Sequence, residues 1–403
     1  MGAETRREST TTALTPPASS LSKRDLRERP VRVTELDRPD GRGLCVAGGG
    51  ERQRRGGDKS SNDQNGRPAA MCGGGFPHCV LPIGPVAGQR KPPDRGNPEN
   101  GVSLVFMQVD AVVVSYNSRR QLRGCVEPLT RIEGVRTFVT DNASTDGAVR
   151  TIADLPVDVL ALPVNRGFGA GCNAGWRRGE APAVLFLNPD ATIDETSLRR
   201  LVVALAADDT VGLVGPRILE AGGSLAFSQR RFPRLRSTYA RALYLHRIFK
   251  RAAWADELIR DPAAYEQPAS PDWVSGACML VRRSVLEEVG GFDERFFLYC
   301  EDKDLCRRIR AAGFDVRYEP AAVARHLGGA SAPRSGLLPV LAGSRVAYAR
   351  KHFHPVSARL EAIGVALNAL THAATAGPAR RSGHLRAIPA AFRRVLEPTS
   401  PNG

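Results

Sequence analysis

The sequence predicts an α/β fold with a mostly parallel central sheet, and two observations carry this prediction. Apolar segments of strand length recur through residues 109–214, and stretches with helical spacing of apolar residues separate them. Each apolar segment stops in a polar turn. Strands and helices that alternate at this spacing form a parallel sheet covered by helices on both faces.

Composition divides the 403 residues into three parts. Residues 1–106 are rich in Gly, Pro, Arg, Ser and Thr and have neither strand nor helix periodicity, so we expect a disordered, low-complexity tail. Residues 107–335 hold the alternating pattern and form the expected globular domain, with Met107 just before its first strand. Residues 336–403 are expected to be a C-terminal helical segment that ends in a basic tail.

The individual elements follow from apolar runs and turn-forming residues. The expected strands are 109–115, 135–140, 157–162, 183–187, 211–214, one that follows a turn near 273–277, and two short ones, of which one contains Val316 and the other leads to His326. The expected helices are 118–129, one that follows the glycine-rich segment 165–176, 194–207, 301–312, and two within 338–374.

The segment 183–191, AVLFLNPDA, is the clearest strand of the chain. Five apolar residues open it, which is typical of a buried strand in a parallel sheet. Pro189 cannot donate to a ladder and restricts the residue before it, so the strand must end near Asn188. Asp190 then lies at the carboxyl edge of the sheet, where open α/β folds bind ligands. There it either holds a divalent cation against a nucleotide diphosphate or belongs to an ordinary turn.

Polar residues follow the other strands in the same way. Right-handed crossovers place the carboxyl ends of parallel strands at one edge of the sheet. We therefore expect five polar residues to converge there: Tyr116, Asn117, Asp141, Asn165 and Asp190. His326, after a later short strand, is either a structural histidine or a further ligand of a cation.

A second acidic cluster opens the helix expected at 301–312. Capping explains it in part, since negative charge is favoured at a helix N-terminus. Asp304 stands four residues before Arg308, so we expect an ion pair between them. Glu301 and Asp302 lie about 100° apart around the helix, so only one can face a cleft squarely. A carboxylate in that position can take the proton of an attacking hydroxyl group.

The glycine-rich segment offers a competing interpretation. Residues 169–174 match G-x-G-x-x-A, the dinucleotide-binding fingerprint, and Asp190 follows about 20 residues on. That motif should open the first strand–turn–helix unit, whereas three strands precede it here. A dinucleotide-dependent oxidoreductase is therefore less favoured, and glycines that only permit close packing of helix on sheet are the simpler explanation.

The net charge of +15 favours an anionic partner. No nucleic-acid-binding motif accompanies it, so a phosphorylated substrate or a lipid surface is favoured over nucleic acid. No apolar run is long enough to span a membrane, and the eight cysteines form no C-x-x-C pair. We expect a cytoplasmic protein in a reducing compartment. Its tail from Gly377 is either solvated or in peripheral contact with anionic lipid at the inner face of the cell membrane.

Taken together, these residues resemble the inverting nucleotide-sugar glycosyltransferases of family 2, which have the GT-A fold. Within that family the chain is most similar to bacterial rhamnosyltransferases of cell-wall and polysaccharide assembly. The matching segments are VVVSYN (112–117), DNASTDG (141–147), NRGFGAGCNAG (165–175), FLNPDA (186–191), WVSGACMLVRR (273–283), GGFDERFFLYCEDKDLCRRIRAAG (290–313) and His326. The resemblance does not cover residues 1–106, and it is poor over 230–268 and after about residue 355.

The resemblance implies roles for individual residues. Tyr116, Asn117 and Asp141 would hold the nucleoside, and the nucleotide-sugar would lie along Asn165, Gly167 and Asn173. Asp190 would correspond to the last carboxylate of the family's metal-binding D-x-D motif, with magnesium or manganese as the cation and His326 as a further ligand. In this chain Asn188 replaces the first Asp of that motif. Asp302 would be the general base, with Glu301 as its substitute, and Trp273 and Gly276 would border the acceptor pocket.

The implied activity is transfer of a sugar from a nucleotide-sugar to a hydroxyl group of a glycan or a polyprenyl-diphosphate-linked glycan. Rhamnose from dTDP-rhamnose is the donor that the resemblance favours. Inverting transfer is a single displacement, so one base is enough and no protein nucleophile is needed. The alternatives are a nucleotide-sugar- or glycan-binding protein without catalysis, a nucleotidyltransferase, and the oxidoreductase considered above.

Overall fold

The computed structural model describes residues 33–35, 107–328 and 335–393, and the account below refers to these residues. The tail expected over residues 1–106 lies outside them, apart from β1 (Val33–Glu35). This short strand departs from the expected disorder, since it pairs in parallel with β4 (Asp158–Ala161) at the edge of the sheet. An edge strand has unpaired backbone groups, and a short extended segment can satisfy them.

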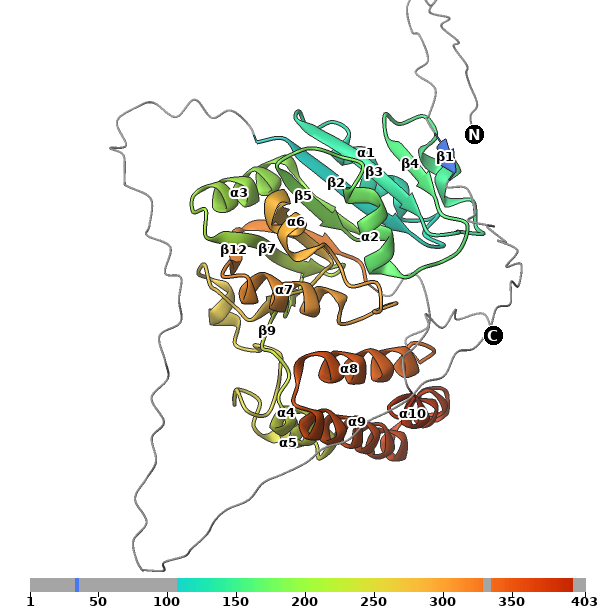
Figure 1. Ribbon diagram of the computed structural model, residues 1–403, viewed down its shortest axis with the longest axis vertical. Helices are drawn as coiled ribbons and strands as arrows, with labels where there is room; N and C mark the ends of the chain where they lie inside the picture. The colour runs from blue at the N-terminus through green and yellow to red at the C-terminus, as the bar shows by residue number, and fades with distance from the viewer. Residues whose placement is uncertain (1–32, 36–106, 329–334, 394–403) are drawn as a thin grey trace, which may run out of the picture. The chain divides into compact units, whose positions relative to one another are not determined.

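The main sheet has the strand order β1-β4-β3-β2-β5-β11-β7-β12-β6 (Figure 1). Its other strands are β2 (Val109–Ser115), β3 (Val135–Asp141), β5 (Ala183–Leu187), β6 (Ala191–Ile193), β7 (Val211–Glu220), β11 (Cys278–Arg282) and β12 (Asp315–His326). The strands from β1 to β5 are parallel, which confirms the predicted mostly parallel sheet. Beyond β5, antiparallel β11 separates β5 from β7, and β12 returns parallel to β7.

One expectation for the last strands needs correction. The short strands expected around Val316 and before His326 are one strand, β12, whose pairing with β7 shifts between Glu319 and Val323. A bulge of this kind interrupts the pattern seen in the sequence without ending the strand. Short β8 (Leu225–Ala226) pairs with β7, and β9 (Gln229–Arg230) pairs with β10 (Trp273–Val274) in a separate two-stranded sheet.

Helices cover both faces of the main sheet, as the alternation predicts. Alternate residues of a strand point to opposite faces, so Val113 and Val112 of β2 belong to different cores. The first core lies under α1 (Leu122–Leu129) and α3 (Glu195–Ala206). The second core lies under α2 (Phe168–Trp176), α6 (Arg283–Val289) and α7 (Glu301–Ala311), which share one side of the sheet in Figure 1.

The C-terminal segment is helical and has its own small core. Its helices are α8 (Leu338–His352), α9 (Pro355–Thr375) and α10 (Pro378–Ala390), and α4 (Leu235–Ala242) and α5 (Leu245–Ile248) accompany them. The first two match the pair expected within 338–374. The residues from Gly377 onward, expected as a basic tail, instead begin with α10, because Ala387 and Ala391 pack into this core. No helix in the described part of the chain is long and apolar enough to cross a bilayer.

A buried ion pair joins the first strand of the domain to α6. Oδ2 of Asp110 lies 2.5 Å from Nη2 of Arg283 and accepts the backbone N–H of Ala181 at 2.8 Å. The two side chains are 3% and 11% exposed. Loss of one partner would leave a charge buried without compensation.

We predict that Arg283→Met lowers the free energy of unfolding by about 3–5 kcal/mol, the usual cost of an orphaned buried charge. Arg136→Met is the matched control, since Arg136 is 60% exposed in its pair with Asp158 and should cost less than about 1 kcal/mol. Urea unfolding of both variants tests this, and equal destabilisation would contradict it.

Candidate functional site

The turn after β5 brings Asp190 to His326 from far along the chain. β6 begins directly after this turn and pairs antiparallel with the end of β12, so that Ala191 lies opposite His326. Nε2 of His326 is 3.1 Å from Oδ1 of Asp190 and 3.4 Å from Nδ2 of Asn188. The Asp190 side chain is 10% exposed and the His326 side chain 27% exposed, so both lie at the margin of solvent. The sequence predicted that these residues act together, and the structure places them in contact.

The chemistry of this pair fits a divalent cation that shares its ligands with a substrate. A carboxylate oxygen and an imidazole nitrogen are both ligands for such a cation. Among the described residues no three His, Cys, Asp or Glu side chains gather closely enough to hold a metal by themselves. Magnesium commonly binds through one or two carboxylates, with substrate phosphates and water as its other ligands. The pair is therefore suited to a cation that arrives with a phosphorylated ligand.

The second acid reaches the same edge of the sheet through β11. Because β11 runs antiparallel to β5 with Cys278 opposite Leu187, the turn before β11 lies where β5 ends. There the backbone N–H of Asn188 donates to the carbonyl oxygen of Ala277 at 3.0 Å. The N–H of the adjacent Gly276 donates to Oδ2 of Asp302 at 3.0 Å. Asp190 and Asp302 thus flank one turn, although 112 residues separate them in sequence.

Gly276 holds Asp302 by close approach as well as by its hydrogen bond. A Cβ atom at this position would lie 3.0 Å from Cβ of Asp302, closer than side chains normally pack. The other oxygen of Asp302, Oδ1, accepts the N–H of Lys303 at 2.7 Å. Asp302 itself is half-buried. Two backbone donors therefore fix a carboxylate that remains partly open to solvent.

Glu301 has a different environment from Asp302. It is 5% exposed, and its Oε2 has no hydrogen-bond partner. Burial, and then the neighbouring charge of Asp302, raises the pKa of Glu301 well above its ordinary value. Cβ of Glu301 packs beside Gly169 of α2, whereas Asp302 is half-buried, so the two acids differ in their access to solvent.

Lys303 and Asp304 anchor the first turn of α7. Nζ of Lys303 lies 3.3 Å from Oε2 of buried Glu257, whose other oxygen contacts Arg345 of α8 at 2.6 Å. Asp304 is fully buried and contacts Nε of Arg308 at 2.7 Å, which confirms the predicted i,i+4 pair. Two further partners of Asp304, missed by sequence reasoning, come from the end of α8: Lys351 and His352.

The backbone before α7 is held in an unusual conformation. Tyr299 and Cys300 have positive φ angles of 68° and 70°. A non-glycine residue there costs roughly 1–3 kcal/mol and persists only where its surroundings enforce it. Cys300 is buried with Phe296 and with Tyr348 of α8. The C-terminal helices therefore support the backbone that aims Glu301 and Asp302.

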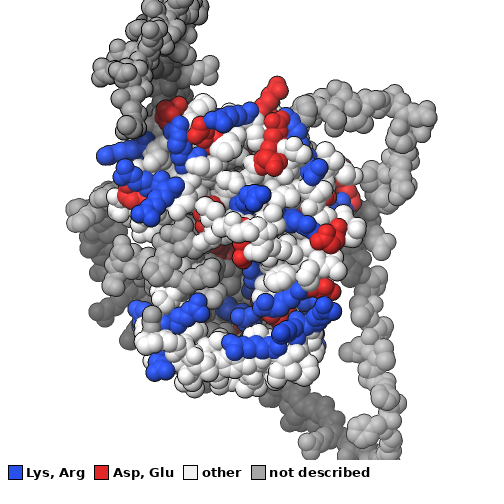
Figure 2. Space-filling view, turned by 180° about the vertical axis from the view of Figure 1, so that it is seen from behind, with Lys and Arg blue, Asp and Glu red and all other residues white. Residues whose placement is uncertain are grey.

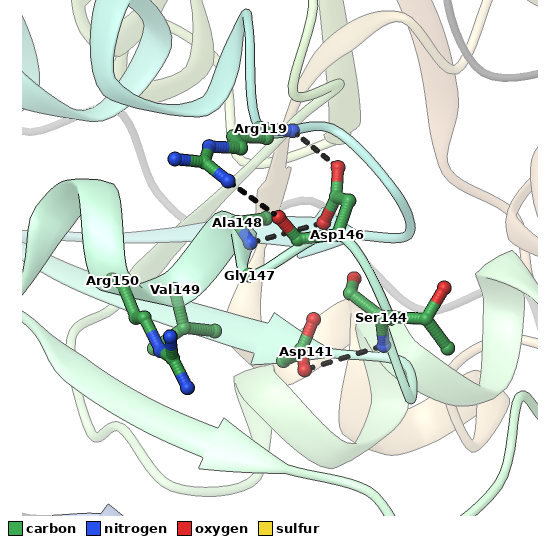
Figure 3. Close-up of a pocket in the computed structure, with 9 residues that line it drawn as sticks. Arg119, Asp141, Ser144, Asp146, Gly147, Ala148, Val149 and Arg150 are labelled. Atoms are coloured by element: carbon green, nitrogen blue, oxygen red, sulfur yellow. Dashed lines mark hydrogen bonds between the residues drawn. The ribbon is translucent and has the colours of Figure 1, made fainter.

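A cavity lies at the carboxyl end of β3, beside Asp141 (Figure 3). Its volume is about 470 Å³, and residues of the turns after β2 and β3 line it: Arg119, Asp141, Ser144, Thr145, Asp146, Gly147, Ala148, Val149 and Arg150. Oδ2 of Asp141 accepts the N–H of Ser144 at 3.4 Å, whereas the buried Oδ1 has no partner. Burial raises the pKa of Asp141 above its ordinary value. Asp141 therefore lines the cavity and carries one buried oxygen without a partner.

The turn after β2 is bound to the loop that lines this cavity and contributes Arg119 to its lining. The N–H of Asn117 donates to Oγ of Ser144 at 3.0 Å, and its Oδ1 accepts the N–H of Thr145 at 2.9 Å. Tyr116 precedes it and is half-buried. Arg119, which sequence reasoning missed, extends beside the cavity with its backbone N–H bound to Asp146. Two consecutive arginines directly follow the turn after β2, and this pair was the sequence feature that could have identified Arg119.

Three residues of the glycine-rich segment, expected to lie along the nucleotide-sugar, make contacts within the protein: Asn165, Gly167 and Asn173. Oδ1 of Asn165 accepts from Asn142 and from the N–H of Gly167, each at 2.9 Å. A Cβ at Gly167 would lie 2.2 Å from the carbonyl oxygen of Phe297. Asn173 is buried and binds Phe292, Glu294 and Trp176. The side-chain amide of Asn173 is thus bound within the protein, and its contact with a nucleotide-sugar stays a prediction.

Glycines of α2 permit close packing, the simpler of the two interpretations of G-x-G-x-x-A. A Cβ at Gly171 would lie 2.7 Å from Val114, and one at Gly175 would lie 2.5 Å from Val112. Both valines belong to β2. The helix must lie directly on the strand, and its glycines face the sheet.

Trp273 is less exposed than the expected role at an acceptor pocket would require. It is 6% exposed, and its Nε1 donates to the carbonyl oxygen of Arg231 at 3.0 Å. Nζ of Lys303 lies 5.1 Å from the centre of its ring. Trp273 thus supports the start of α7, and only Gly276 of the two residues expected at that pocket contacts Asp302 directly.

Comparisons with known proteins agree with this arrangement. N-acetylglucosaminyl-diphospho-decaprenol L-rhamnosyltransferase of Mycobacterium tuberculosis is 34% identical over 206 residues, 48% of this chain and 66% of that protein. Rhamnosyltransferase WbbL of Escherichia coli K12 is 31% identical over 158 residues, 38% of this chain and 54% of that protein. The chain thus spans less than two thirds of the length of either relative.

Among solved structures, the mannosyltransferase PcManGT from Pyrobaculum calidifontis, in complex with GDP-Man and Mn2+, has a TM-score of 0.44 at 20% identity. That alignment covers 71% of this chain and 86% of the other. The family model described as glycosyltransferase like family 2 matches residues 108–342, from the residue before β2 into α8. Since this match covers more than half of the chain and both acidic clusters, the chain belongs to glycosyltransferase family 2.

Proposed function

We propose that this protein is an inverting glycosyltransferase that transfers rhamnose from a nucleotide-sugar, dTDP-rhamnose, to a hydroxyl group of a polyprenyl-diphosphate-linked glycan. The observation that carries the proposal is the turn flanked by Asp190 with His326 on one side and Asp302 on the other. Membership of glycosyltransferase family 2 supports the reaction class. The sugar and the lipid carrier are supported by the name of the M. tuberculosis relative.

The nucleoside end of the donor occupies the cavity beside Asp141. The free Oδ1 of Asp141 accepts a hydrogen bond from an N–H of the base or an O–H of the ribose. Arg119 and Arg150 lie at the same cavity and attract the negatively charged donor. Asn117 contributes by holding the loop that carries Ser144 and Thr145.

The diphosphate lies toward Asp190. Asp190 and His326 are the residues that would hold a magnesium or manganese ion there, as part of a ligand set shared with the diphosphate. When bound, the cation neutralises the charge that develops on the leaving nucleoside diphosphate. The amide of Asn188, in the place of a carboxylate, orients His326 and brings no charge of its own.

Asp302 is the general base. Its two backbone hydrogen bonds fix the carboxylate at the turn beside Asn188, and the remaining lone pairs are free to accept the proton of the acceptor hydroxyl. Glu301 is unsuited to the same task, because its buried carboxyl group retains its proton to a higher pH and lies away from solvent. The acceptor therefore approaches past Gly276.

The first test is a panel of nucleotide-sugars with detection of released nucleoside diphosphate. We predict that Asp302→Asn lowers turnover by about 10²–10⁴-fold, the usual contribution of a general base, while donor binding persists. Glu301→Gln is the matched control and should lose far less activity. Near-wild-type turnover of Asp302→Asn would remove the assignment. Donor binding without turnover in the wild-type protein would favour a binding protein.

The cation site has a separate test. We predict that Asp190→Ala abolishes the part of donor affinity that depends on magnesium or manganese, because one of two protein ligands is lost. Calorimetric titration of the donor, with and without a chelator, measures this in both proteins. A chelator that leaves wild-type affinity unchanged would contradict the site.

Asp141 links stability to donor binding. Its pKa is higher in the folded protein, so the folded state binds the proton more tightly than the unfolded state. The free energy of unfolding therefore falls as the pH rises from the unfolded pKa to the folded pKa. Above the folded pKa this cost is fully present. We predict that Asp141→Asn is more stable than wild type at pH 7, equally stable below about pH 3, and about tenfold weaker in binding nucleoside diphosphate. A variant that is less stable at pH 7 would refute the burial argument.

A further inference from the structure

Large apolar side chains are exposed almost entirely in one part of the described protein. Apart from Val164, Val203 and Leu327, all of them lie in residues 243–254 and 356–392. Isolated exposed apolar residues are normal on any protein, but a concentration in two adjoining segments indicates an interaction surface.

On α9 these residues form a stripe along the helix. Val356, Leu360, Ile363 and Leu370 recur at spacings of three to seven residues, which places them on one side, and they are 55%, 40%, 49% and 54% exposed. The buried side of α9 carries mainly small residues: Ala358, Ala362, Gly364, Ala369 and Ala373. The helix therefore turns its larger aliphatic side chains outward, the reverse of what water favours.

The segment around α5 adds aromatic residues beside this stripe. Leu243, Ile248, Phe249 and Trp254 are 55%, 73%, 47% and 37% exposed. Two tyrosine hydroxyl groups join it to α9: Tyr239 of α4 donates to the carbonyl oxygen of Leu360, and Tyr244, just before α5, donates to that of Thr371. The two sets of apolar side chains thus belong to one helical layer.

The charges of this layer are of one sign. Every charged residue of 234–254 is Lys or Arg, and the single acidic residue of 335–393 is Glu361, which is buried against Arg345. Figure 2 shows Lys and Arg prevailing among the charged residues on the helical part at the lower end of that view. Basic residues next to exposed aliphatic and aromatic side chains match a membrane surface with anionic headgroups. A second copy of the chain would bring two basic surfaces together, and their repulsion disfavours it.

We infer that the layer formed by α4, α5 and α9 docks on an anionic lipid surface. Ile248, Phe249 and the α9 stripe enter the interface, while Arg247, Lys250, Arg251 and Arg359 bind headgroups. The inference extends the proposed function, because a lipid-linked acceptor is reached from a membrane, but it stands on separate observations. It adds α4, α5 and α9 to the tail from Gly377, for which the sequence left a lipid contact open.

Vesicle co-sedimentation of the full chain tests the inference, with vesicles of phosphatidylglycerol and phosphatidylcholine compared with phosphatidylcholine alone. We expect binding to the anionic vesicles that weakens at high salt. The triple variant Ile248→Ser/Ile363→Ser/Leu370→Ser should lose at least about tenfold in affinity for the anionic vesicles. The control Val203→Ser changes a residue that is 56% exposed on α3, and it should bind as wild type does. All four positions are exposed, so folding should persist.

Three outcomes would overturn the inference. The wild-type chain could fail to bind either vesicle, the triple variant could bind as tightly as wild type, or self-association that the triple variant abolishes could appear without vesicle binding. The vesicles contain neither donor nor acceptor, so a failure here leaves the proposed transfer reaction intact. Vesicle binding by a protein that turns over no nucleotide-sugar would refute only the proposed reaction.

Discussion

The register between β5 and β11 is the constraint on which the rest of the site depends. β11 inserts antiparallel beside the parallel strands, with Cys278 opposite Leu187, and the hydrogen bond from Asn188 to Ala277 extends the pairing past the end of β5. A shift by one residue would turn every side chain of β11 to the other face of the sheet. The present register puts Gly276 at the sheet edge, where it binds Asp302.

Successive residues at the start of α7 carry out different tasks because helix geometry points them in different directions. Asp302 is half-buried at the sheet edge, Glu301 packs against α2, and Lys303 and Asp304 form buried ion pairs. Buried charges are tolerated only with such partners. The partners come from Glu257 and from α8, which makes the C-terminal helices part of the scaffold of the site.

Charge is distributed unevenly over the protein. Carboxyl groups with raised pKa values, Asp141 and Glu301, lie at or near the sheet edge, and shifted titration of this kind is common at functional sites. The layer of α4, α5 and α9 is basic and partly apolar. A negatively charged donor and a lipid surface can thus be engaged at different places.

The sequence by itself determined most strands of the main sheet, its mostly parallel character, the ion pair of Asp304 with Arg308 and the family, because each of these depends on local pattern. An apolar run that ends at Asn188-Pro189 must end a strand there, and residues four apart on a helix are neighbours whatever surrounds them. Only the tertiary structure decided that Asn173 is buried, that Trp273 supports α7, that Glu301 lies away from solvent and that α9 turns its larger aliphatic residues outward. Their partners lie on other elements, and burial and charge pairing over such separations depend on how helices and strands pack, which spacing in sequence does not encode.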